Sequence, residues 1–172
     1  MAYHFSEAAP VSGPEKLVKY SKLAGDRALE GYAWEEVMPY FQNGLAAMEI
    51  NFEGPTPVMD EESAGLMFGL GRSQMALLDN EAHRSLRRAL DYYAQSGDLE
   101  KVVAIAELPD YSATRNIRIE QIIAPALALV PPDSLQAGRL LSRRGQIIGL
   151  QEANYDEAID ALNQVLDISR SE

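Results

Sequence analysis

The sequence predicts an all-α protein built from a stack of about four helical hairpins. Apolar residues recur every three or four positions along most of the chain, which is typical of helices with one buried face. The same helical pattern appears three times. No segment alternates apolar and polar residues between tight turns, so we expect no β-sheet.

The clearest copy of the repeated pattern lies at residues 154–166. Asn154 and Glu157 are spaced as a capping box, which predicts that a helix begins here. The face that follows combines a small residue with a larger one, which allows a neighbouring helix to approach closely. The three copies of this face are Val37, Phe41 and Gly44; Ala82, Leu86 and Ala89; and Ala158, Leu162 and Val165.

The first hairpin is predicted at residues 14–50. Ser12 and Glu15 form a candidate capping box for a helix that runs to about residue 30. The second helix runs from Trp34 to about residue 50 and contains Pro39. Because proline lacks a backbone N–H and crowds the preceding turn, we expect a kink or a late start near Glu36.

The other hairpins are predicted to begin near residues 61, 98 and 134. Residues 51–59 contain Gly54, Pro55 and Pro57 and therefore predict a loop. Asp60, Asn80 and Asp133 are the candidate N-caps of later helices. The helices are predicted at about 61–78, 81–95, 99–108, 117–129 and 135–150, with a loop at 109–114, before the helix that Asn154 caps.

Composition and charge indicate a folded, cytoplasmic protein of one domain, residues 1–172. Its 26 acidic and 15 basic residues give a net charge of -11, which disfavours direct binding to nucleic acids or anionic membranes. It has no cysteine, no apolar run long enough to span a membrane and no secretory signal pattern. Residues 1–12 form either a docking tail or the end of a preceding helix.

No set of residues predicts catalysis, a metal site or a cofactor. His4 and His83 have no partner at metal-binding spacing. The carboxylates cluster at predicted helix N-termini, where the helix dipole already accounts for them. Gly69 and Gly71 lie inside a helical pattern rather than in a phosphate-binding loop. We therefore expect a protein that is not an enzyme.

Two groups of arginines are the candidate binding residues. Arg84, Arg87 and Arg88 lie on one predicted helix, and Arg139, Arg143 and Arg144 lie on another. The alternative that we favour is ion pairing with the abundant acidic residues. A recognition groove, if there is one, would use Arg84, Arg88, Tyr92, Arg139 and Arg143.

The repeated pattern resembles the tetratricopeptide repeat, a helix-turn-helix unit. Gly25, Gly71 and Gly145 fall near the conserved glycine of that family. Val37 and Gly44 replace its usual alanines, and the repeats are unequally spaced. The resemblance implies a right-handed α-α superhelix that binds proteins.

Several phrases are similar to the helical-repeat arm of large bacterial LuxR-type regulators and related multidomain ATPase sensors. They are Ala2-Tyr-His-Phe, residues 19–29, Tyr32-Ala-Trp-Glu-Glu, residues 88–94 and residues 131–142. This resemblance implies a role in sensing an effector or docking a partner. The ATPase and DNA-binding residues of those regulators map onto nothing here, so the alternatives are an excised domain and a stand-alone derivative.

These observations predict a non-enzymatic scaffold for protein–protein interaction or regulation, whose partner is a protein or a peptide. The alternative is an effector-binding module that takes a small anionic ligand or peptide in a concave groove. Exposed apolar ends, among them Ile159, Leu162 and Leu166, also predict homo-oligomers.

Overall fold

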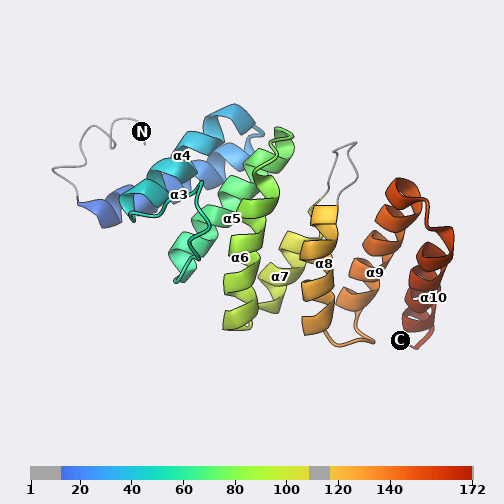
Figure 1. Cartoon of the computed structure of the whole chain (residues 1–172). Helices are drawn as coiled ribbons and strands as arrows, with labels where there is room; N and C mark the ends of the chain where they lie inside the picture. The colour runs from blue at the N-terminus through green and yellow to red at the C-terminus, as the bar shows by residue number, and fades with distance from the viewer. Residues whose placement is uncertain (1–12, 109–116, 172) are drawn as a thin grey trace. The chain divides into compact units, whose positions relative to one another are not determined.

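The computed structural model describes residues 13–108 and 117–171, which form α-helices, one π-helical turn and no strand (Figure 1). The all-α class is therefore confirmed for these residues. The predicted loop at 109–114, residues 1–12 and the proposed cap Ser12 lie outside them. In order the elements are α3 (Pro14–Glu30), α4 (Trp34–Ala47), α5 (Glu61–Ala76), α6 (Ala82–Ser96), α7 (Leu99–Ala106), α8 (Ile117–Leu129), α9 (Leu135–Ile147), η1 (Ile148–Glu152) and α10 (Tyr155–Ser171).

Two of the predicted helix starts are confirmed by their capping bonds. The Asp60 carboxylate accepts the backbone N–H of Ser63 at 2.8 Å. Asn154 accepts the N–H of Glu157 at 3.4 Å and donates its own side-chain N–H to the Glu157 carboxylate at 2.9 Å. Caps depend on neighbours within one turn, so the sequence carries this information directly.

The cap of α9 differs by one residue from the prediction. Ser134, rather than Asp133, caps α9, because its hydroxyl accepts the N–H of Ala137 at 3.1 Å. Ahead of α6, the Asp79 carboxylate accepts the N–H of Glu81 at 2.9 Å. Asp and Ser are both good capping residues, and composition alone does not choose between neighbours.

Of the two outcomes expected from Pro39, a kink or a late start near Glu36, the late start is wrong, because the helix begins at Trp34. The carbonyl of Ala33 accepts the N–H groups of Glu36 and Val37 at 3.0 and 3.1 Å and closes the first turn. Pro39 lies inside the helix and removes a single backbone donor. The apolar packing of α4 holds the turn despite that loss.

The chain divides into two compact units, residues 1–92 and 93–172, and the boundary falls inside α6. In the first unit, α4 packs on both α3 and α5. Phe41 is completely buried, with its ring against Gly25 and Gly69. A Cβ atom would come within 2.6 Å of the ring at Gly25 and within 2.3 Å at Gly69. Only glycine leaves room for this ring.

The contact between glycine and a large side chain recurs in two further hairpins. A Cβ atom on Gly71 would lie 2.7 Å from Leu86, and one on Gly145 would lie 3.2 Å from Leu162. The glycines are the three that the sequence placed in first helices, and Phe41, Leu86 and Leu162 hold equivalent positions in the repeated pattern. The handedness of a larger stack stays a prediction.

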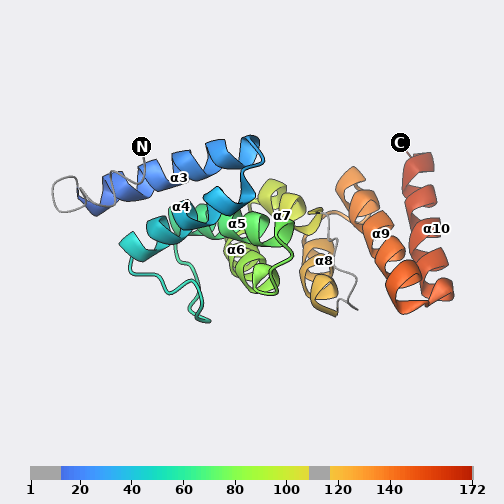
Figure 2. The same cartoon turned by 90° about the horizontal axis from the view of Figure 1, so that it is seen from above.

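In the second unit, α8 packs on α7 and α9, and α9 packs on α10. The last two helices lie side by side in both views (Figures 1 and 2). Helix α9 ends at Ile147 and continues into the π-helical turn η1, so the predicted helix to residue 150 is not a regular α-helix throughout. None of the helices in the two described ranges has the length and apolar character needed to cross a bilayer.

Candidate functional site

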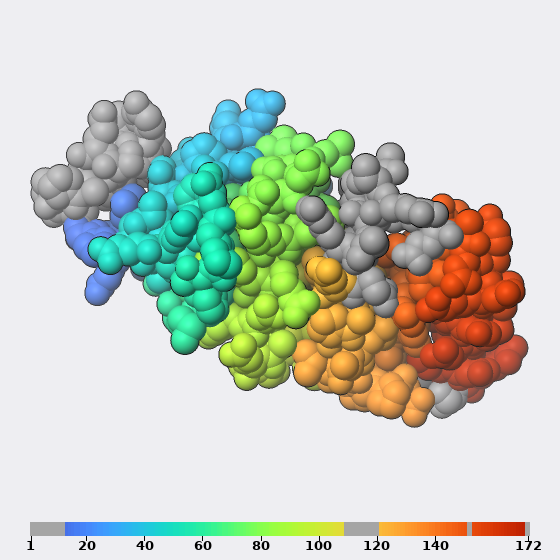
Figure 3. All heavy atoms as spheres, viewed as in Figure 1, coloured from blue at the N-terminus to red at the C-terminus, as the bar shows by residue number. Residues whose placement is uncertain are grey.

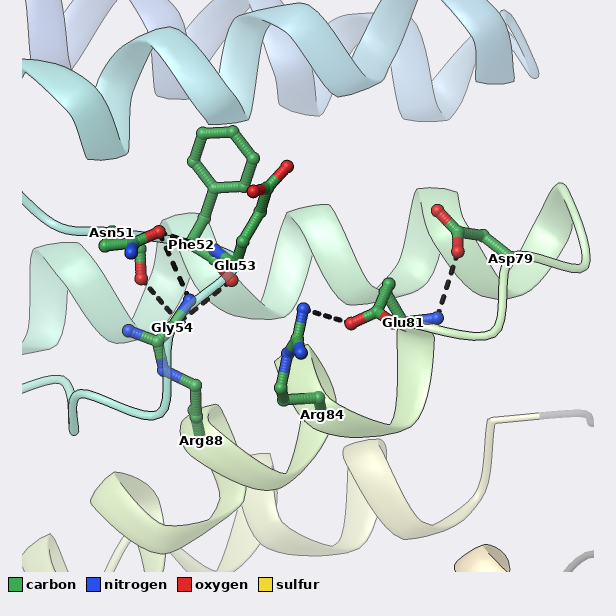
Figure 4. Close-up of polar contacts among 8 residues, drawn as sticks. All are labelled: Asn51, Phe52, Glu53, Gly54, Asp79, Glu81, Arg84 and Arg88. Atoms are coloured by element: carbon green, nitrogen blue, oxygen red, sulfur yellow. Dashed lines mark hydrogen bonds and ion pairs between the residues drawn. The ribbon is translucent and has the colours of Figure 1, made fainter.

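The first candidate set lies on α6 at a spacing of four residues and consists of Arg84, Arg88 and Tyr92. Arg88 is only 6% exposed. One terminal nitrogen of its guanidinium donates to the backbone carbonyls of Asn51 and Phe52, both at 3.1 Å (Figure 4). Arg88 therefore holds the loop between α4 and α5 rather than opening onto solvent.

The loop is shaped for this contact by Asn51. Its side-chain oxygen accepts the backbone N–H groups of Glu53 at 3.0 Å and Gly54 at 3.2 Å. This turn leaves the carbonyls of residues 51 and 52 available to the guanidinium (Figure 4). The loop forms part of the visible surface beside α6 (Figure 3). Arg88 thus acts as its anchor.

Arg88 is a buried cation for which no carboxylate partner is found among the described residues. Its Nε and second terminal nitrogen are buried and donate no hydrogen bond to any described residue. Burial lowers the pKa of Arg88 below its ordinary value, and the nearby Arg84 lowers it further. Arg84 itself pairs with Glu81, and Tyr92 is half-buried. The buried nitrogens of Arg88 are too enclosed to receive a ligand.

The second candidate set lies on α9 and borders a groove of about 610 Å³ in the second unit. Arg139, Ser142, Arg143 and Gln146 occupy one face of α9, since their spacing is three, four and seven residues. The groove is lined by Glu107, Leu135, Gly138, Arg139, Ser142, Arg143, Gln146, Val165, Ile168 and Ser169. It therefore joins a basic edge to an apolar wall from α10.

Both groove arginines are held in place by the end of α7. Arg139 pairs with the Glu107 carboxylate at 2.5 Å, and Arg143 donates to the carbonyl of Leu108. The second oxygen of Glu107 is buried and has no hydrogen-bond partner in the described part of the chain. Two guanidinium groups and one carboxylate therefore line this side of the groove.

A second depression of about 560 Å³ shares the ion pair of Arg139 and Glu107 with the groove. Its other lining residues come from α7, the start of the turn after α8, and α9, and include Leu99, Val103, Val130 and Gln136. The pair therefore stands between the two depressions. An anion that binds Arg139 would compete with Glu107.

The other two arginines of the candidate groups, Arg87 and Arg144, form ion pairs. Arg87 pairs with Asp91 at 2.7 Å within α6, and Arg144 of α9 pairs with Glu157 of α10 at 3.0 Å. The ion-pair interpretation therefore describes these two side chains well. The structure brings Arg139 and Arg143 to one groove, and it places Arg84 and Arg88 in the other unit.

Sequence reasoning missed Glu107, Ser142 and Gln146. Ser142 and Gln146 were detectable, because they share the helical face of Arg139. Glu107 was not, because it lies 32 residues from its partner. No group of three metal-binding side chains forms within residues 13–108 and 117–171. Comparison with known proteins finds no matching family model, curated protein or solved structure.

Proposed function

We propose that this chain is a non-enzymatic, tetratricopeptide-like scaffold that binds an acidic segment of a partner protein. Its role would be similar to that of the sensor arm in bacterial LuxR-type regulators. The observation that carries the proposal is the groove along α9, where Arg139 and Arg143 face an apolar wall. Helical-repeat proteins use such extended surfaces to bind partners.

The repeat interpretation draws its support from the recurring glycine contact. In three hairpins, a glycine of the first helix admits a large side chain of the second, at Gly25, Gly71 and Gly145. A repeated contact at equivalent positions is what stacked copies of one structural unit require.

The charges of the groove favour a peptide with a carboxylate side chain. Arg139 and Arg143 against Glu107 leave a local excess of one positive charge in a chain with a net charge of -11. A guanidinium binds a carboxylate through two parallel hydrogen bonds.

The apolar wall adds selectivity for a neighbouring apolar residue of the peptide. Val165 is half-buried and Ile168 is 8% exposed, so both sit partly in the core and partly in the groove. A peptide side chain that covers them removes apolar surface from water at about 25 cal/mol per Å². We therefore expect an acidic residue next to an apolar one.

A small anionic effector is the second candidate, because the same two arginines would receive it. Glu107 weighs against this ligand class. A phosphate carries up to two negative charges, and like charge at close range disfavours binding. A peptide carboxylate carries a single negative charge, so Glu107 opposes its binding less.

The test selects 12-residue peptides from a random display library against the whole chain. Each acidic peptide found is then compared by fluorescence polarisation with its Glu→Gln or Asp→Asn counterpart. Hydrogen bonds to charged groups contribute about 1.5–3 kcal/mol, so neutralising the peptide should weaken binding about tenfold to hundredfold. Arg143→Gln should cause a similar loss.

Arg87→Gln is the matched control, because it breaks an ion pair on α6, away from the groove. It should leave peptide affinity unchanged. If the selected peptides bind wild type and Arg143→Gln with equal affinity, the groove is not the binding site. Two results together would favour the effector instead. The selection would yield no peptide that binds, and nucleotides or sugar phosphates would raise the melting temperature of wild type but not of Arg143→Gln. Saturation a hundredfold above the dissociation constant stabilises by about 2.7 kcal/mol.

A further inference from the structure

Helix α10 presents an exposed apolar stripe that touches α9 only at its edge, where Leu162 lies against Gly145. Tyr155, Ile159, Leu162 and Leu166 follow each other at spacings of four, three and four residues. They are 66%, 54%, 44% and 51% exposed. This spacing keeps them on one face and is the pattern that a second helix packs against. Large exposed apolar patches mark interaction sites.

One edge of this stripe is acidic. Asp156, Asp160 and Asp167 are exposed and share a face beside the apolar residues. Asp156 and Asp160 form no ion pair within the described residues, and Asp167 pairs weakly with Arg170 at 3.7 Å. With Arg170 included, the α10 surface carries a net charge of two negative units. A partner helix with basic edges would complement it.

Helix α3 has a surface of the opposite charge. Its outward side carries Tyr20 and Leu23, which are 38% and 44% exposed. Lys16, Lys19 and Arg27 surround them, are exposed, and form no ion pair with any described residue. Glu30 at the end of the same side reduces the net charge to two positive units.

We propose that the α3 surface of one copy of this chain binds the α10 surface of a second copy. Pairing α10 with α10 would bring the aspartates of both copies together, and pairing α3 with α3 would bring their lysines together. Only the mixed pairing joins apolar centres while opposite charges meet. This inference does not depend on the acidic-peptide groove, whose α10 lining is Val165, Ile168 and Ser169 rather than the stripe residues.

Such an interface is heterologous, because the two surfaces differ. Each bound copy still has one free surface, so assembly continues into open chains or closes into rings. The net charge of -11 on every copy opposes association at long range. We therefore expect assembly that grows with protein concentration rather than a tight dimer.

The experiment measures molar mass by sedimentation equilibrium over a range of concentrations. Wild type should pass beyond the mass of a dimer at high concentration. Leu23→Glu, which repels the aspartates, and Ile159→Lys, which repels the lysines, should each be monomeric. Met59→Lys is the matched control on an 81% exposed loop residue and should assemble as wild type does. Circular dichroism checks that every variant is folded.

Mixing the two defective variants distinguishes the proposed pairing from its alternatives. Leu23→Glu keeps an intact α10 surface, and Ile159→Lys keeps an intact α3 surface. An equal mixture should therefore form dimers and nothing larger. Assembly of Leu23→Glu alone would show that α10 pairs with itself and would overturn the proposal. A monomeric wild type at all concentrations would also overturn it.

The sequence suggests a second candidate for the contact between copies, namely residues 1–12. A chain without these residues should assemble as wild type does, because both proposed surfaces remain. Loss of assembly in that chain, with helices α3 and α10 intact by circular dichroism and thermal unfolding, would assign the contact to the N-terminal segment and overturn the proposal.

Discussion

Replacing Gly69 by alanine tests the packing of Phe41 between two helices. The added methyl group would lie 2.3 to 2.7 Å from three ring atoms of Phe41. The ring cannot retreat, because Gly25 on the other side already approaches it as closely as a glycine allows. Overpacking of a core costs about 1–3 kcal/mol, and this contact belongs at the upper end. Alanine gains about 1 kcal/mol in helix propensity. We expect a net destabilisation of about 2 kcal/mol.

Trp34 allows this effect to be measured in the first unit alone. It is the single tryptophan of the chain and lies at the start of α4. Its fluorescence during urea unfolding therefore follows the unit that contains Phe41. Gly31→Ala is the control, since the nearest atoms to its added methyl group lie at 3.6 Å and its φ of -83° suits alanine. It should be neutral or more stable by about 0.4–1 kcal/mol.

A double variant tests whether Phe41 is the side chain that clashes with the added methyl group. Phe41→Leu shortens the side chain against which the new methyl group clashes. The combination of Gly69→Ala with Phe41→Leu should be less destabilised than the sum of the single changes, with a coupling of about 0.5–3 kcal/mol. If Gly69→Ala unfolds at the same urea concentration as Gly31→Ala, the proposed packing is incorrect.

Substitutions at three further positions test other parts of the fold. Ala158→Leu should destabilise by about 1–3 kcal/mol, because Ala158 is 6% exposed and packs against Gly145 and Gly149; an unchanged melting temperature would contradict the helical register. Asp60→Ala should lose about 0.5–2 kcal/mol with the cap of α5, while Asp60→Asn should lose little, as judged by thermal unfolding. Arg88→Met should remove the guanidinium donor from two loop carbonyls, at about 1–3 kcal/mol, and expose the loop after α4 to limited proteolysis. A loop equally resistant in wild type and Arg88→Met would show that Arg88 is not its anchor.

The sequence by itself determined where most of the helices lie. Helical periodicity, capping residues and helix-ending glycines act within a few residues of each other, so the sequence contains them in full. Asp60 and Asn154 cap as expected, and α6 ends before Gly97, which takes a positive φ of 77°. Helix α4 begins at Trp34, so the late start that Pro39 allowed did not occur, because tertiary packing outweighed the local preference of proline.

Only the tertiary structure decided what the polar side chains do. Arg88 binds carbonyls 36 and 37 residues away, so its burial depended on where the loop folds. The pattern marked Arg139 in the same way as Arg88, yet Arg139 meets Glu107 at the edge of a groove. The arginines have equal spacing on the two helices, yet Arg88 is buried and anchors a loop, whereas Arg139 forms an ion pair at the surface. The physical reason is that periodicity assigns a residue to a face, whereas its partners and burial come from segments that are remote in sequence.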